Sequence, residues 1–171
     1  MSAGHLIGRF IGSLWPGPPK AADDDWARAQ LVPGEVELWN RMCNQDRRHS
    51  VGVARDTIAL LGGHAERPVI AAALLHDVGK VQSNLGTFHR VVATLSAGIA
   101  GRETAELWVR SSGITRRIGL YLTHPEIGGD LLEMAGSDPL TSTWAREHHK
   151  PEDQWTLPAD ITAALNEADN D

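Results

Sequence analysis

Residues 68–80 read PVIAAALLHDVGK, so eight apolar residues lead without a break into a histidine and an aspartate. A helix that is apolar on every side is buried in the protein core. Such a helix would carry His76 and Asp77 into the interior, where an isolated carboxylate is strongly penalised unless it is paired or bound to a metal. We expect Gly79 to loosen the end of this helix. The plain alternative is a helix that simply stops at a polar C-terminus.

Length and composition restrict the class of protein. The 171 residues, 42% hydrophobic and 22% charged, predict one ordinary globular domain with a substantial core. The net charge of −6 argues against binding a nucleic-acid polymer, which needs a basic face. Cys43 is the single cysteine, so no internal disulfide can form. With no apolar run of the ~18–20 residues that a membrane span needs, and no signal-peptide pattern, we expect a cytoplasmic protein without a transmembrane segment. A homodimer is a possible oligomeric state.

Helical periodicity recurs along the chain, and no stretch alternates as a strand would. The predicted fold class is therefore all-α. Residues 6–15 form an amphipathic pattern that we expect to dock on the protein's own core, with a membrane surface or a partner protein as the alternatives. The acidic stretch 21–25 is typical of a linker. This predicts an N-terminal arm over 1–33 and a main domain over 34–171. The predicted helices of the domain include 35–42, 46–61 with Asp46 as its cap, 88–100, 102–110, 115–123, 125–136, 139–149 and a final helix from 158.

Several potential metal ligands lie on the apolar faces of these helices. His49, His148 and Asp169 each follow or precede core residues of their helix at four-residue steps, and His124 lies at a helix junction. One such histidine alone is more often a hydrogen-bonded core residue. Four imidazoles and two carboxylates together match a two-metal site, and this donor set suits Fe, Mn, Zn or Ni better than Mg or Ca. Asp77, next to a ligand histidine, is the natural bridge between two ions.

The order H…HD…H…H…D resembles the HD superfamily of metal-dependent phosphohydrolases. The resemblance covers roughly residues 45–171 and rests on RHS at 48–50, ALLHDVGK at 73–80, HPEIG at 124–128, REHHK at 146–150 and NEADND at 166–171. HPEIG and the double histidine are most similar to the HD-GYP subgroup, whose members hydrolyse cyclic di-GMP. No GYP sequence follows His149, however, which argues against that substrate. Gln45 is neutral where some trimetal members have an acidic ligand, so we expect two metals.

The resemblance implies an HD-domain helical bundle around a buried metal site. Two divalent transition metals, iron or manganese first and zinc or nickel as alternatives, would be held by the set His49, His76, Asp77, His124, His148 and Asp169. They would activate a water for in-line attack on the phosphorus of a small anionic substrate. Asp77 and Lys80 are the predicted catalytic residues, with Lys80 contacting the phosphoryl group. His149 is a further candidate, as a ligand, a partner of a ligand or a substrate contact.

Two alternatives from other functional classes share these ligands. One is an HD-type diiron oxygenase, which uses the same set of ligands as the hydrolase and differs from it in the chemistry of its iron. The other is a non-catalytic, metal-bound HD module that serves in signalling. Arg47 and Arg48, beside His49, either face an anionic substrate or lie on the solvated surface.

Overall fold

The computed structural model describes residues 17–85 and 104–170, and within these two ranges it is helical, without a strand. The all-α prediction is confirmed for this part of the chain. The helices predicted over 6–15 and 88–100 lie outside it. No helix in the described ranges is both long and apolar enough to cross a membrane.

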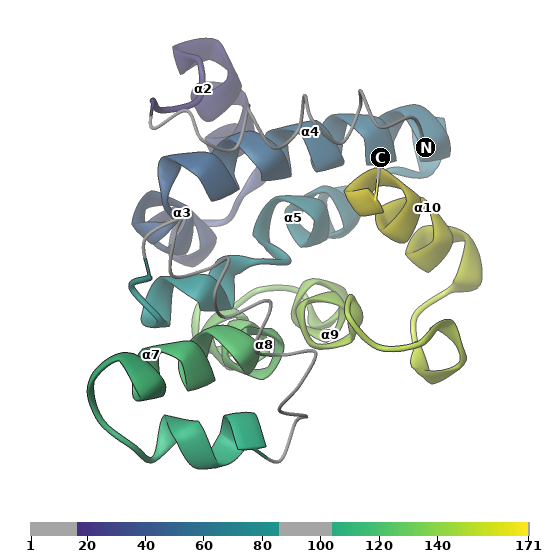
Figure 1. The fold of residues 1–171 in the computed structure, drawn as a ribbon. Coiled ribbons are helices and arrows are strands. Elements are labelled where there is room, and N and C mark those ends of the chain that lie inside the picture. The colour runs from purple at the N-terminus through teal and green to yellow at the C-terminus, as the bar shows by residue number, and fades with distance from the viewer. Residues whose placement is uncertain (1–16, 86–103, 171) are drawn as a thin grey trace, which may run out of the picture.

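Eight α-helices and three short 3₁₀ turns make up most of the described residues (Figure 1). The α-helices are α2 (Ala21–Gln30), α3 (Pro33–Arg41), α4 (Asn44–Leu61), α5 (Arg67–Leu75), α7 (Gly113–Leu122), α8 (His124–Met134), α9 (Pro139–Glu147) and α10 (Ala159–Asn170). The 3₁₀ turns are η1 (Gly62–His64), η2 (Val78–Gln82) and η3 (Glu152–Gln154). A further helical segment, 104–109, precedes α7.

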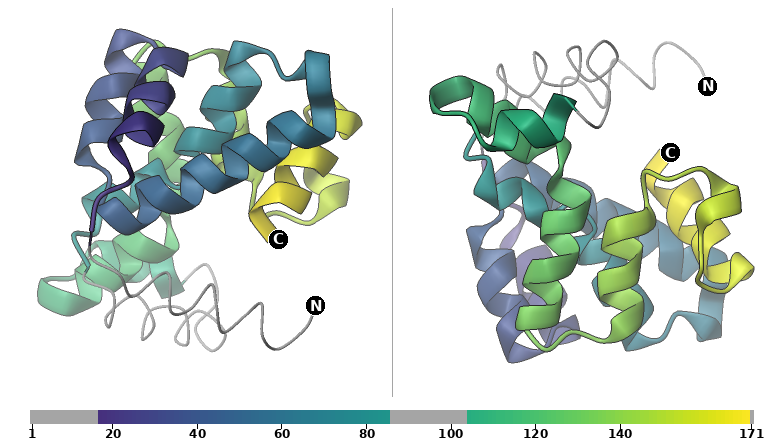
Figure 2. Two further views of the ribbon diagram at one scale, coloured as in Figure 1. Left: turned by 90° about the horizontal axis from the view of Figure 1, so that it is seen from above. Right: turned by 90° about the horizontal axis from the view of Figure 1, so that it is seen from below.

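Helix α5 lies at the centre of the bundle. It packs against α4 on one side and α9 on the other, and every residue from Val69 to Leu75 is buried (Figure 1). The right-hand view of Figure 2 shows α8 and α9 side by side, joined by the short connection 135–138. Helix α10 packs on α4. The apolar sequence of α5 therefore becomes the axis on which the surrounding helices assemble.

Gly79 lies where two elements approach each other closely. We expected Gly79 to loosen the end of the helix, but α5 already ends at Leu75 and Gly79 lies in η2. A Cβ at position 79 would collide with the carbonyl oxygen of His124 and would lie 2.7 Å from the backbone nitrogen of Gly128. The absent side chain lets the first turn of α8 pack directly on η2. This contact brings His124 next to Asp77.

The predicted linker over 21–25 is wrong, because these residues begin α2. Ala27 and the adjoining Leu31 belong to the same hydrophobic core as α5. The segment is therefore a packed part of the bundle. Local sequence could not show this, because an acidic start to a helix and an acidic linker have the same composition.

Asp24 connects α2 to the core through three partners. Its carboxylate accepts a hydrogen bond from Trp39 Nε1 at 2.8 Å and pairs with Arg28 at 2.8 Å and Arg47 at 3.1 Å. Trp39 is fully buried, and a buried indole N–H needs an acceptor. Asp24 supplies that acceptor from 15 residues away.

Asp24→Asn should lower the free energy of unfolding by about 1 kcal/mol at pH 7, because two charged partners lose their counter-ion. Burial raises the pKa of Asp24, but hydrogen bonds from Arg28 and Trp39 outweigh it and hold the pKa below 3.8. The ionised carboxylate therefore stabilises the fold above about pH 4, and this contribution is lost as the pH falls through the folded-state pKa. Chemical denaturation from pH 7 to pH 3 should show the two proteins converging, whereas exposed Asp25→Asn should match wild type throughout.

Gly79→Ala should lower the free energy of unfolding by about 2–3 kcal/mol, because an inserted methyl group must push the backbone of α8 away. Gly52→Ala is the matched control: Gly52 is exposed within α4, and a Cβ there meets nothing within 4 Å. That variant should be neutral or more stable by up to about 1 kcal/mol. Equal effects of the two changes in urea denaturation would contradict the proposed packing.

Candidate metal centre

The structure brings all six predicted ligands to one region. Each comes from a helix or from the residues that end one: His49 from α4, His76 and Asp77 from the end of α5, His124 from the first turn of α8, His148 from the end of α9 and Asp169 from the last turn of α10. Asp77 and the imidazoles of His76, His124 and His148 are buried. Helices that are far apart in sequence thus converge on the carboxylate at the end of α5.

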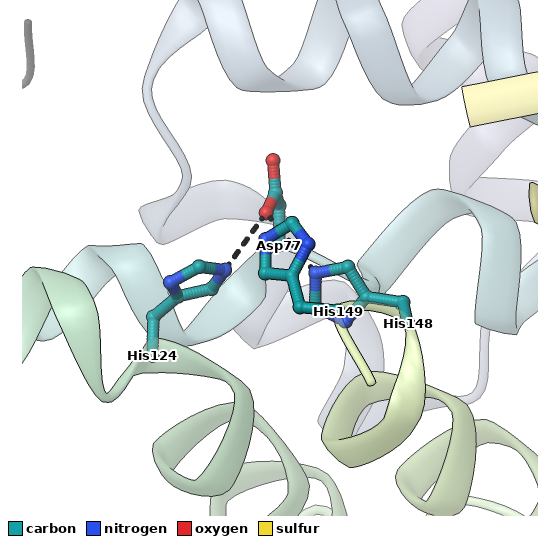
Figure 3. Close-up of side chains that lie close together, drawn as sticks. All are labelled: Asp77, His124, His148 and His149. Carbon is teal, nitrogen blue, oxygen red and sulfur yellow. Dashed lines mark ion pairs between the residues drawn. The ribbon is translucent and has the colours of Figure 1, made fainter. Parts of the chain in front are cut away.

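The carboxylate of Asp77 faces two sets of imidazoles. Its Oδ1 lies 3.2 Å from His124 Nε2 and 3.7 Å from His148 Nε2, while Oδ2 lies 3.5 Å from His76 Nε2. Figure 3 shows the side turned toward His124, His148 and His149.

We call the two sets the first group (His49, His76, Asp77) and the second group (Asp77, His124, His148, His149). In each group the candidate ligand atoms all lie within 4.8 Å of one another. Asp77 belongs to both groups.

Asp169 joins the first group through contacts with its two histidines. Its Oδ1 lies 2.8 Å from His49 Nε2 and 3.5 Å from His76 Nε2. The packing of α10 on α4 makes this contact, since the last turn of α10 then meets the first half of α4. The apolar stripe that continues into Asp169 therefore leads to the centre, as the spacing in the sequence predicted.

The three buried rings are oriented by the main chain. In His76, His124 and His148, Nδ1 lies 2.7–2.9 Å from the carbonyl oxygen three residues earlier. A carbonyl can only accept, so Nδ1 carries the hydrogen. In the neutral ring Nε2 then presents its lone pair, and in all three residues Nε2 lies beside Asp77. This is how metal-binding histidines are commonly fixed in proteins.

A metal ion fits the donor atoms of this cluster. Among the described residues, neither Nε2 of His124 nor Nε2 of His148 has a hydrogen-bond partner, although both are buried. A buried polar atom without a partner is costly. Donor atoms that share one transition-metal ion at about 2.0–2.2 Å stand about 3.0–3.6 Å apart. The separations of 2.8–3.7 Å around Asp77 and Asp169 are close to that spacing.

Charges within the cluster are strongly coupled. Burial disfavours the protonated form of His76, but the carboxylates of Asp77 and Asp169 outweigh burial and raise its pKa to about 9. Burial raises the pKa of Asp77, yet Lys80 and His76 hold it well below its usual value. Without a metal, a proton on His76 therefore supplies positive charge that the carboxylates require.

Lys80 lies beside the centre, where its Nζ forms an ion pair with Oδ2 of Asp77. The same Nζ lies 5.7 Å from the centroid of the Tyr121 ring. Burial disfavours the charged amine, but Asp77 raises the pKa of Lys80 above its ordinary value. Lys80 is therefore a fixed cation next to the shared carboxylate.

His149 belongs to the second group although its side chain is exposed. Its ring centroid lies 4.0 Å from that of His148 and 5.2 Å from that of His124. Partial burial of the ring, and then the neighbouring rings of His148 and His124, lower the pKa of His149 below its usual value. The ring is thus neutral near pH 7, which is the form that binds metal.

Asp46 lies near the centre, and its predicted role as the cap of the helix is wrong. Helix α4 begins at Asn44 with Cys43 as its N-cap, so Asp46 lies inside the first turn and is not the cap. It is buried, and its charge helps to raise the pKa of Lys80. Its spacing could have indicated this place, because Asp46 lies three residues before His49 and therefore on the same side of the helix.

Arg47 and Arg48 make contacts that hold the fold together. Arg47 pairs with Asp24 of α2 and donates to Asn44 at 2.6 Å, and Arg48 donates to the carbonyl oxygen of Gly17. Both side chains therefore connect α4 to the N-terminal part of the described chain.

Comparison with known proteins adds no relative: no family model, no curated protein and no solved structure matches the chain. A buried histidine–aspartate cluster in the middle of an all-helical fold can hold a metal ion.

Asp77→Asn should remove most of the metal that the protein takes up from manganese or iron after treatment with a chelator. Loss of a residue that only supports a ligand weakens metal binding by about 10–100-fold, and Asp77 itself contributes to both groups, so a loss at the upper end is expected. The matched control is His64→Ala, since His64 is exposed in η1. Metal analysis with circular dichroism as the check on folding would test this. Uptake by wild type no greater than by Asp77→Asn would refute the metal site.

Proposed function

We propose that the protein is a metal-dependent phosphohydrolase of the HD type, which cleaves a small phosphate ester at a centre of two divalent transition metals. Iron or manganese are the first candidates. The observation that supports this most directly is the position of Asp77, with one carboxylate oxygen beside His76 and the other beside His124 and His148. Two-metal phosphatases hold their ions about 3.5–4 Å apart, a distance that a shared carboxylate can span.

The two groups provide the ligands for such a pair. Asp169 with the first group would hold one ion, and the second group would hold the other. Divalent ions in these places supply Lewis acidity toward a phosphoryl group and lower the pKa of a water molecule.

The charge of the centre explains how an acidic protein would attract an anion. Asp46, Asp77, Asp169 and Lys80 together carry two net negative charges when the imidazoles are neutral. One divalent ion balances this charge, and a second makes the centre positive. The overall charge of −6 therefore does not prevent binding of a phosphate ester at this place.

Contacts within the protein itself hold the residues around the centre. Three imidazoles are buried and held by main-chain carbonyls. Lys80 is held between Asp77 and the ring of Tyr121, and we assign it the role of contacting a phosphoryl oxygen as a point charge. Donors that need no rearrangement during the reaction contribute most to stabilising a transition state.

The experiment is a screen of phosphomonoesters, nucleotides and cyclic dinucleotides with manganese- or iron-loaded protein, with released phosphate as the readout. Asp77→Asn should lower kcat by at least about 100-fold, the loss typical when one electrostatic element of an active site is removed. His64→Ala should retain wild-type activity.

Two outcomes would replace the proposal with another function. Oxygen uptake with an organic substrate, together with a mixed-valence iron signal, would indicate the oxygenase. A loaded, folded protein that hydrolyses none of these esters would indicate a non-catalytic module.

A further inference from the structure

A pocket of about 550 Å³ adjoins the second group. His149 lines it, and so do Thr123 and Pro125, the two chain neighbours of His124. The pocket therefore lies on the His124–His149 side of the centre. Its volume lies within the ~300–1,000 Å³ typical of sites for small organic ligands.

Part of the pocket wall is apolar. Val109, from the end of the helical segment 104–109, Leu122 at the end of α7, and Pro125 all contribute side chains to it. An inorganic phosphate compound would leave this surface in contact with water. A ligand with an organic body would cover it and gain from its burial.

Two cations on the same pocket have no ion-pair partner among the described residues. Within the described ranges, neither Arg110 nor Lys150 forms a side-chain hydrogen bond or an ion pair. Two carboxylates, Glu106 and Glu126, also line the pocket, and Glu126 lies 3.9 Å from Arg146 Nε.

Arg146, the third cation of the pocket, already forms ion pairs within the protein. Its Nη2 lies 2.7 Å from Asp130 and 3.0 Å from Glu133, and its guanidinium occupies the space that a side chain at Gly129 would take. Arg110 and Lys150 are thus the cations that a ligand can reach without breaking an existing pair.

We propose that this pocket binds the leaving-group part of the substrate, and that the substrate is an organic phosphate whose apolar body carries a second anionic group. The inference rests on the proposed phosphohydrolase function. The reacting phosphoryl group lies at the metal centre, the apolar body covers Val109 and Leu122, and Arg110 and Lys150 contact the second anion. Arginine and lysine bind carboxylates and phosphates through charge-assisted hydrogen bonds.

Three phosphonates test the inference without turnover, because their P–C bonds do not hydrolyse. 4-Phosphonobenzoate has an apolar body and two anions, phenylphosphonate lacks the second anion, and phosphonoacetate lacks the aromatic body. On the manganese-loaded full chain, calorimetry should show 4-phosphonobenzoate binding about tenfold more tightly than either of the others, the gain expected for one charge-assisted contact or for covering the apolar wall.

Variants of the pocket test its two cations and its apolar wall one at a time. The double variant Arg110→Gln, Lys150→Gln should bring 4-phosphonobenzoate to within about threefold of phenylphosphonate, since the second anion then has no charged partner. Val109→Asp should weaken both aromatic ligands while leaving phosphonoacetate less affected. The control is Arg116→Gln, because Arg116 is exposed on α7 and does not line the pocket; it should change nothing.

The outcomes distinguish this inference from the function on which it rests. Equal affinity for the three ligands, or equal weakening of all three by the double variant and by Arg116→Gln, overturns the inference even if esters are hydrolysed. If the three ligands bind in the expected order but the protein hydrolyses no ester, the proposed phosphohydrolase function is wrong and the binding site remains. A chain that takes up no metal overturns both.

Discussion

A carboxylate buried in the interior of a helical protein must be neutralised, and the arrangement around α5 meets this requirement at Asp77. Lys80 supplies a charge from the following 3₁₀ turn, and His76 supplies a proton. Helix α8 begins and helix α9 ends beside the same carboxylate, and His49 joins the centre from the second turn of α4. The same surrounding elements therefore pack against the apolar helix α5 and compensate the charge at its end.

The parts of this arrangement that depend on local periodicity could be predicted from the sequence. A ligand that points into the core must lie on the core-facing stripe of its helix, so His49, His148 and Asp169 could be found by their four-residue steps. The structure places all three at the centre, His148 among the buried residues. His124 could be found because Pro125 marks the start of a helix, and α8 does begin there.

The parts that depend on distant partners could not be predicted. Asp24 acts through Trp39 and Arg47, 15 and 23 residues away, and nothing in an acidic stretch indicates those contacts. Gly79 is needed because the backbone of α8 lies against it, a fact about two elements separated by more than 40 residues. Periodicity reports which face of a helix is buried, but it does not report what that face meets.

The hydrogen bonds from Nδ1 to main-chain carbonyls have a consequence for how such a centre can change. Many metal sites orient their histidines with other side chains, which a mutation can remove. Here each carbonyl lies three residues before its ring, in α5 for His76, in α9 for His148 and in the last turn of α7 for His124, so the adjoining backbone sets each orientation. A carbonyl does not titrate, and no amino-acid replacement deletes it. The helix ends that carry His76 and His148 could therefore be grafted onto another bundle with their ring orientation, whereas His124 would need the junction of α7 and α8 to be transferred with it.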